Sequence, residues 1–227
     1  SETGNSPDIV IKELTFFNNT LFIIMNECLA DKEYINDFVL KYFAKEKINE
    51  QDKNKKTFNT TTNILDYLEQ TITTHKITRV NNFDDLFYSV LTGFSIIMVE
   101  GYDEVLSLET RIKLDSGINE SKSEMVIKGP KDAFTENYQT NIGLIRKRIH
   151  SKNLWLKEQI IGSKSETKVG ILYVNDIASN ELVDMITEKI KNINIDGIFD
   201  SNYIIELISE NESNVFANYI STERPDL

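Results

Sequence analysis

Hydrophobic positions near the start of the chain first follow a strand period and then a helix period. Residues 8–17 and 20–26 are two apolar runs separated by Asn18 and Asn19, which predicts a β-hairpin. From Asp31 onward, apolar residues recur every three or four positions, which predicts an amphipathic helix. Its apolar residues are Tyr34, Ile35, Phe38, Val39, Tyr42 and Phe43. Residues 44–59 lose this period and mix both charge signs, so we expect a surface loop there.

The next stretch predicts two helices, a strand and a second hairpin. One helix carries its apolar residues at 64, 65, 68 and 72, and the other at 86, 87, 90 and 91 after the capping residue Asn82. Residues 76–80 read as a strand between them. Two apolar runs at 94–99 and 104–110 flank a turn at Gly101, which indicates a hairpin.

The second half of the chain, after a polar interval, also shows hydrophobic positions with strand and helix spacing. Phe134, Tyr138, Ile142, Ile145 and Ile149 follow a helical spacing and predict one helix. Apolar runs at 154–161 and 166–174 surround a turn, and the second ends in four apolar residues, as is typical of a central buried strand. Ser179 is expected to cap a helix with its apolar face at 182, 183, 186, 190 and 193. A short helix is expected at 203–208.

These patterns predict a mixed α+β fold of the α/β class, built from two small α/β subdomains. Residues 115–124 are small and polar and offer almost nothing to bury. We therefore expect an N-terminal subdomain at 1–114, a linker at 115–125 and a C-terminal subdomain at 126–227.

Composition narrows the classes of partner. The 227 residues carry 25 Lys and Arg against 36 Asp and Glu, a net charge of −11, which disfavours bulk nucleic-acid binding. Apolar runs such as 21–25 are far shorter than the roughly 20 residues of a spanning helix. Cys28 is the single cysteine, so the simplest compartment is reducing and cytoplasmic.

No spacing of residues predicts catalysis, a metal or a cofactor. His75 and His150 lie far apart in sequence and far from Cys28, so no familiar metal-ligand pattern is present. The chain has no Gly-x-Ser-x-Gly elbow. Gly129 and Pro130 fall short of a phosphate loop and are better explained as a turn that begins a helix. We expect a protein that is not an enzyme and uses no cofactor.

A local basic cluster stands out against the acidic background. Arg146, Lys147 and Arg148 are followed by Lys152 near the expected end of a helix, where the helix dipole favours cations. Two interpretations stay open: a solvated helix end, and a specific guanidinium–carboxylate contact with another subdomain or subunit.

One long segment resembles a known family. Residues 129–149 read GPKDAFTENYQTNIGLIRKRI and are similar to the signature of the GerA family, the A subunits of bacterial spore germinant receptors. Agreement continues through 169–186, 195–208 and TERPD at 222–226. The chain departs from the family pattern at residues 117–121 and 215–217. The residues singled out for interaction or structure are Gly129, Pro130, Phe134, Thr135, Asn141, Arg146, Arg148, Thr222, Glu223, Arg224 and Pro225.

The resemblance implies a soluble domain of a spore inner-membrane receptor, facing the spore core, with a membrane region after TERPD. Its partners would be a transporter-like B subunit and a C lipoprotein, and the A subunits would assemble as homo-oligomers. The implied function couples subunit assembly and the germinant signal to ion release. Two alternatives remain open: a module that binds a small-molecule germinant between its two lobes, and a SpoVAF-type paralogue.

Overall fold

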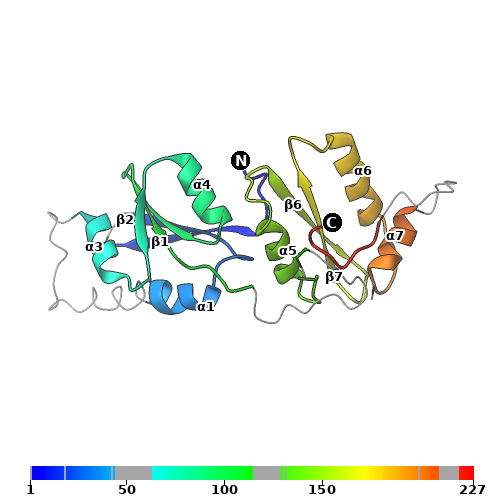
Figure 1. Ribbon diagram of the computed structural model, residues 1–227, viewed down its shortest axis with the longest axis horizontal. Helices are drawn as coiled ribbons and strands as arrows, with labels where there is room; N and C mark the ends of the chain where they lie inside the picture. The colour runs from blue at the N-terminus through cyan, green and yellow to red at the C-terminus, as the bar shows by residue number, and fades with distance from the viewer. Residues whose placement is uncertain are drawn as a thin grey trace. The chain divides into compact units, whose positions relative to one another are not determined.

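The computed structural model describes residues 2–17, 19–41, 43, 63–114, 129–130, 132–198, 200–209 and 220–227, with the backbone alone at Phe38. The chain forms two compact units (Figure 1). The N-terminal unit is Asp8–Leu114, and the C-terminal unit combines Ser1–Pro7 with Asp115–Leu227. The structure thus groups the first seven residues with the second unit, whereas the sequence placed them in the first. The predicted linker 115–125 and loop 44–59 lie outside the described residues.

A five-stranded antiparallel sheet organises the N-terminal unit, in the order β1-β2-β4-β5-β3. Its pairings confirm both predicted hairpins, and one row of the sheet aligns Lys12, Ile23, Ile97, Leu106 and Arg79 across all five strands. The strands are β1 (Ile9–Phe16), β2 (Asn19–Asn26), β3 (Ile77–Val80), β4 (Ser95–Val99) and β5 (Val105–Leu108).

Helices cover both faces of this sheet, which explains why its central strands are apolar in nearly every position. On one face Leu21, Ile97 and Leu106 pack with residues of the helices before β3. On the other face Ile96 and Val105 pack with the helix that follows β3. The helices are α1 (Lys32–Tyr34), the π-helix η1 (Ile35–Leu40), α3 (Ile64–Thr71) and α4 (Phe83–Leu91).

Side-chain caps fix the starts of these helices. Asp31, Asn63 and Asn82 each accept a hydrogen bond from a backbone N–H in the first turn of α1, α3 and α4. The helix predicted from Asp31 forms, but it continues as a π-helix, and its buried residues include Ile35 and Val39.

The C-terminal unit is built around one antiparallel hairpin, β6 (Leu154–Ile161) and β7 (Thr167–Val174). One face carries a cluster of isoleucines from α6 (Asn180–Lys191) and α7 (Ser201–Ser209), joined by Val169 and Ile171 of β7. On the other face, Tyr138 of α5 (Tyr138–Arg146) lies against Gly170, where a Cβ would come within 2.7 Å of the Tyr138 hydroxyl.

The N-terminal residues from 2 to 7 pack along β6. Ser6 Oγ accepts a hydrogen bond from Leu156 N at 3.0 Å and donates to Thr3 O at 2.9 Å. Gly4 has φ +62°, and a Cβ there would come within 2.1 Å of the Trp155 ring. Glycine is therefore required by both the left-handed backbone and the close approach of the indole.

Three predictions for the C-terminal half are wrong in detail. The helix predicted from Phe134 to Ile149 spans only α5, because Asn137 caps it and the residues before it are held by other hydrogen bonds. Among the described residues, β7 pairs with β6 alone and so lies at the edge of a two-stranded sheet, where a central strand was expected. Leu182 of α6 is 48% exposed, so it does not belong to the buried face of the helix.

Candidate functional site

Two segments far apart in the sequence meet in the C-terminal unit. Phe134 N donates a hydrogen bond to Glu223 O at 2.7 Å, which joins the GPKDAF segment to TERPD. Arg224 donates from Nε and Nη2 to the two carboxylate oxygens of Asp226. This contact lowers the pKa of Asp226, and the charge of Arg148 lowers it further. The last described residues are therefore fixed against the segment that precedes α5.

An amide–hydroxyl network holds the residues between Phe134 and α5. Asn141 Oδ1 accepts from Thr135 N at 2.7 Å, and Asn141 Nδ2 donates to Thr135 O at 2.7 Å. Asn137 N donates to Thr135 Oγ1, and the Asn137 side chain caps α5 by accepting from Thr140 N. One helix side chain thus satisfies both backbone groups of Thr135, which keeps that residue out of the helix.

Arg148 connects the end of α5 to Asp132, at the start of the segment that precedes this helix. Its Nη2 lies 2.7 Å from both carboxylate oxygens of Asp132, and its Nη1 donates to Leu144 O at 2.9 Å. About a quarter of each side chain in the ion pair is exposed. Arg148 thus makes a guanidinium–carboxylate contact, but with a residue of its own unit and not with another subdomain or subunit as predicted.

Arg146 is buried, with 1% of its surface exposed. Its Nη1 donates to Leu154 O at 2.6 Å, so the guanidinium ties α5 to the first residue of β6. A buried cation must be stabilised by hydrogen bonds, because desolvation of the charge is costly. The solvated-end interpretation is wrong for this residue.

A pocket of about 1070 Å³ opens beside these contacts, and all of its lining residues belong to the C-terminal unit. Glu136, Lys168, Asp200 and Glu223 supply charged groups. The pKa of Asp200 is lowered by hydrogen bonds from Asn202 and Ser201, so this carboxylate stays ionised. The apolar wall is formed by Phe134, Ile142, Ile145, Leu172, Ile198 and Ile204.

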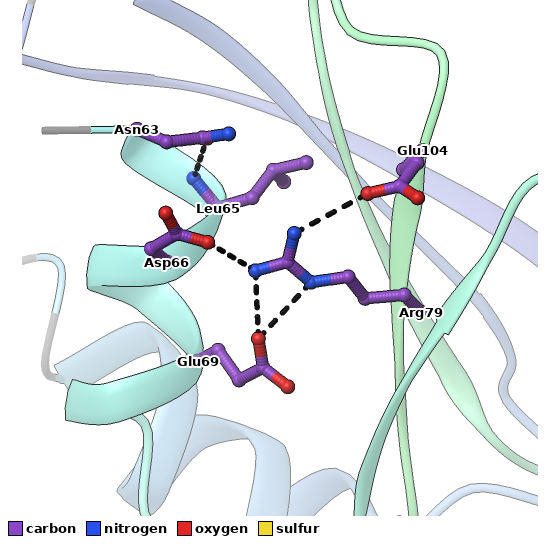
Figure 2. Close-up of polar contacts among 6 residues, drawn as sticks. All are labelled: Asn63, Leu65, Asp66, Glu69, Arg79 and Glu104. Atoms are coloured by element: carbon purple, nitrogen blue, oxygen red, sulfur yellow. Dashed lines mark hydrogen bonds and ion pairs between the residues drawn. The ribbon is translucent and has the colours of Figure 1, made fainter.

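The N-terminal unit has its own polar cluster around Arg79 of β3 (Figure 2). Arg79 contacts Asp66 and Glu69 of α3, with Nη2 to Glu69 Oε2 at 2.8 Å, and its Nη1 lies 3.3 Å from Glu104. The three carboxylates raise the pKa of Arg79. The cluster links α3 to β3, the edge strand of the sheet, so we assign it a role in holding these two elements together.

The structure brings together most of the residues that the sequence singled out. Phe134, Thr135, Asn141, Thr222 and Glu223 line the pocket, and Arg146, Arg148 and Arg224 support it. Gly129 has φ +135° and precedes α5 by several residues, so the Gly129–Pro130 turn does not begin that helix. No contact with another described residue assigns a role to Pro225.

Sequence reasoning missed the partners of these residues. Asp132, Lys168 and Asp226 were not singled out, although Asp132 and Asp226 lie inside the segments that carry the resemblance. The sequence signal that could have identified Asp132 and Asp226 is their position in the same segments as Arg148 and Arg224, the arginines that they bind. Lys168 lies on β7, outside those segments, and only the fold brings it to the pocket.

Within the described ranges, no group of three or more His, Cys, Asp or Glu residues could hold a metal ion. His75 stacks against Tyr34 at 6.4 Å between ring centroids, and Cys28 is buried. Over the same ranges, no helix is both long enough and apolar enough to cross a bilayer.

The sequence of the chain is similar to those of known spore germination and sporulation proteins. The chain is 28% identical to spore germination protein KA of Bacillus subtilis (strain 168) over an alignment of 229 positions, covering 100% of this chain and 40% of the relative. It is 28% identical to stage V sporulation protein AF of the same organism, covering 99% of this chain and 44% of that protein. The chain thus spans less than half the length of these curated relatives.

A solved structure is similar over nearly the whole chain. The N-terminal domain of the A subunit of the Bacillus megaterium spore germinant receptor GerK3 matches with a TM-score of 0.69 and 30% identity, covering 99% of this chain and 80% of that one. This similarity confirms the predicted mixed α/β fold. The family model for the Bacillus/Clostridium GerA spore germination protein matches residues 1–227. The chain therefore belongs to the GerA family of spore germination proteins.

Proposed function

We propose that this chain is part of a spore germinant receptor A subunit and that it transmits the germinant signal between subunits instead of catalysing a reaction. Family membership and the similarity to the GerK3 N-terminal domain support this assignment. In this proposal the receptor lies in the spore inner membrane, the two units face the spore core, and a B subunit and a C lipoprotein complete a complex with several A subunits.

The observation that carries the proposal is the connection between TERPD and α5. The resemblance implies that the membrane region follows TERPD, so residues 222–226 would be the first to move when that region changes state. The backbone hydrogen bond from Phe134 N to Glu223 O joins residues 222–226 to the pocket wall. The hydrogen bonds between Thr135 and Asn141 continue the connection into α5. Movement of residues 222–226 would therefore displace α5 and promote ion release through the assembled receptor.

Deletion and complementation in spores of the source bacterium test this assignment. Loss of the gene is expected to abolish the response to one set of germinants, and the full-length gene is expected to restore it. The paralogue alternative, supported by the similarity to stage V sporulation protein AF, predicts a broad change in ion release with every germinant. A deletion that leaves all germination and ion release unchanged would contradict both assignments.

The pocket supports a second candidate function, the binding of a small-molecule germinant. A volume of about 1070 Å³ with an apolar wall and several charged groups fits a polar organic ligand. The pocket lies within one unit, whereas the sequence placed this candidate site between the lobes. Calorimetry with amino acids, sugars and potassium salts tests it, and micromolar affinity for one of them would favour ligand binding over signal transmission.

A further inference from the structure

The hydrogen-bond directions in the β6–β7 hairpin show which backbone groups of β7 point away from β6. Asn175 N donates to Asn153 O at 2.8 Å, and these residues continue the register that pairs Leu154 with Val174. Hydrogen-bonded pairs alternate along an antiparallel ladder. The backbone groups of residues 167, 169, 171 and 173 therefore face β6, and those of 168, 170, 172 and 174 face outward.

Within the described residues, the first half of the outer edge of β6 is covered, whereas most of the outer edge of β7 is open. On β6, Arg146 binds Leu154 O and Ser6 Oγ binds Leu156 N. On β7, Val174 O accepts from the backbone N–H groups of residues 177 and 178. Throughout the part of the chain that the structure describes, the outward N–H and C=O groups of Lys168, Gly170 and Leu172 have no hydrogen-bond partner.

This open edge borders the pocket. Lys168, Gly170 and Leu172 all line it, together with Phe134, and the other lining elements are α5, the start of α7 and Thr222–Glu223. An unpaired row of alternating donors and acceptors is a template for another strand. The adjoining volume of about 1070 Å³ gives room for the side chains of such a strand.

The charges and apolar residues around the edge indicate the chemistry of the occupant. Glu136, Asp200 and Glu223 contribute three carboxylates to the lining, against the single ammonium of Lys168, which lies 3.5 Å from Glu158. The net charge of −11 disfavours a second copy of the same chain at this edge. The apolar wall favours a segment that also carries aliphatic side chains.

We infer that β7 accepts an extended peptide segment of a partner protein as a third strand, with alternating basic and aliphatic residues. The backbone of the peptide would pair with Lys168, Gly170 and Leu172, and its basic side chains would reach the carboxylates of the pocket. The inference rests on the proposed signalling function, because it supplies that function with a docking edge beside TERPD. The docking test below uses the chain alone, so it can fail while the spore experiments succeed.

The probe is a peptide of about seven alternating Lys and Val residues, acetylated and amidated at its ends, which is long enough to span the open edge. It is titrated into the isotopically labelled 227-residue chain while the backbone amide resonances are recorded. The amides of Lys168, Gly170 and Leu172 are expected to shift most and to exchange more slowly with deuterium. Glu replaces Lys in one control peptide, and alternate backbone nitrogens are methylated in another, and both controls are expected to bind at least about tenfold more weakly.

A matched pair of variants separates backbone pairing from side-chain attraction. Lys168→Ala removes the ammonium and keeps the outward N–H, whereas Lys168→Pro removes that N–H from an edge position where proline is tolerated. The proline variant is expected to bind the peptide about tenfold more weakly than the alanine variant. Should the proline variant fail to fold, the methylated peptide supplies the same comparison with an unaltered protein.

Four results would overturn the inference. The first is the absence of shifts at the outward amides up to millimolar peptide. The second is equal binding of the acidic or methylated peptide. The third is equal binding of free lysine amide, which would indicate a small-molecule amine site. The fourth is concentration-dependent dimerisation that protects these amides without peptide, which would assign the edge to a second copy.

Discussion

Arg146 is the residue at which charge and burial conflict most strongly. It is among the largest side chains with almost no exposed surface, and it donates to Leu154 O on the neighbouring strand. Sequence reasoning detected the basic cluster but could not separate Arg146 from Arg148, because burial depends on where β6 packs. Both arginines support α5, one from inside the core and the other from its rim.

Replacing Arg146 with lysine should destabilise the chain by about 2 kcal/mol, because the ammonium cannot reproduce the planar donor geometry in a buried position. Urea denaturation followed by circular dichroism measures the change. Lys147→Arg, an exchange at the exposed neighbouring position, is the matched control and should change stability by less than about 0.5 kcal/mol. Equal effects of the two substitutions would contradict the buried role of Arg146.

Asp226 should make the stability of the folded chain dependent on pH in the acidic range. Its pKa is lowered by the hydrogen bonds from Arg224, so the ionised form is favoured in the folded state. The resulting stabilisation is fully present above the ordinary carboxyl pKa of 3.8 and is lost as pH falls through the lowered value. Thermal unfolding at neutral pH and near pH 3 should therefore show a smaller acid-induced loss of Tm in Asp226→Asn than in the unmodified chain. An identical loss in both would exclude this contribution.

At the scale of elements, the sequence predicted the parts that depend on local signals. The hairpins at 9–26 and 154–174 followed from apolar runs and turns, and Asn82 and Ser179 cap their helices as expected. Periodicity failed for α5, because Phe134 keeps the helical spacing while hydrogen bonds between Thr135 and Asn141 hold the backbone outside the helix.

The position of β7 could not be predicted from its composition. Its last four residues are apolar because helices pack on both faces of the hairpin, and a central strand would show the same pattern. The pattern of side chains reports which faces are covered but carries no information on whether an edge is paired. The open edge therefore became visible only with the register of the two strands.

Asn141→Ala should loosen the segment before α5. The substitution removes the side chain that satisfies both Thr135 N and Thr135 O, so a loss of about 1–3 kcal/mol and faster hydrogen exchange at Thr135 are expected. Asn137→Ala, which removes only the cap, is the comparison and should cost about 1 kcal/mol without exposing the Thr135 amide. Unchanged exchange at Thr135 in the Asn141 variant would show that other contacts hold the segment.

At the scale of the molecule, the acidic charge should keep the isolated chain from assembling. Identical copies with a net charge of −11 repel one another at low salt, so we expect a monomer in solution and weak binding of amino acids, sugars or potassium salts. Sedimentation and calorimetry measure the two properties. A stable ring of the isolated chain would indicate assembly driven by this region, and a micromolar dissociation constant would support the ligand-binding alternative.

The connection that runs from TERPD through residues 132–135 to α5 is the central claim, and charge exchange at its Asp132–Arg148 contact in the full-length protein tests it most directly. Asp132→Arg and Arg148→Asp each break the ion pair, and the double variant recreates it in the opposite order. Germination rate, with the amount of protein in the spores as the control, should fall in each single variant and recover in part in the double variant. Single variants that germinate like the unmodified strain, or a double variant without recovery at equal protein levels, would contradict signal transmission through this contact.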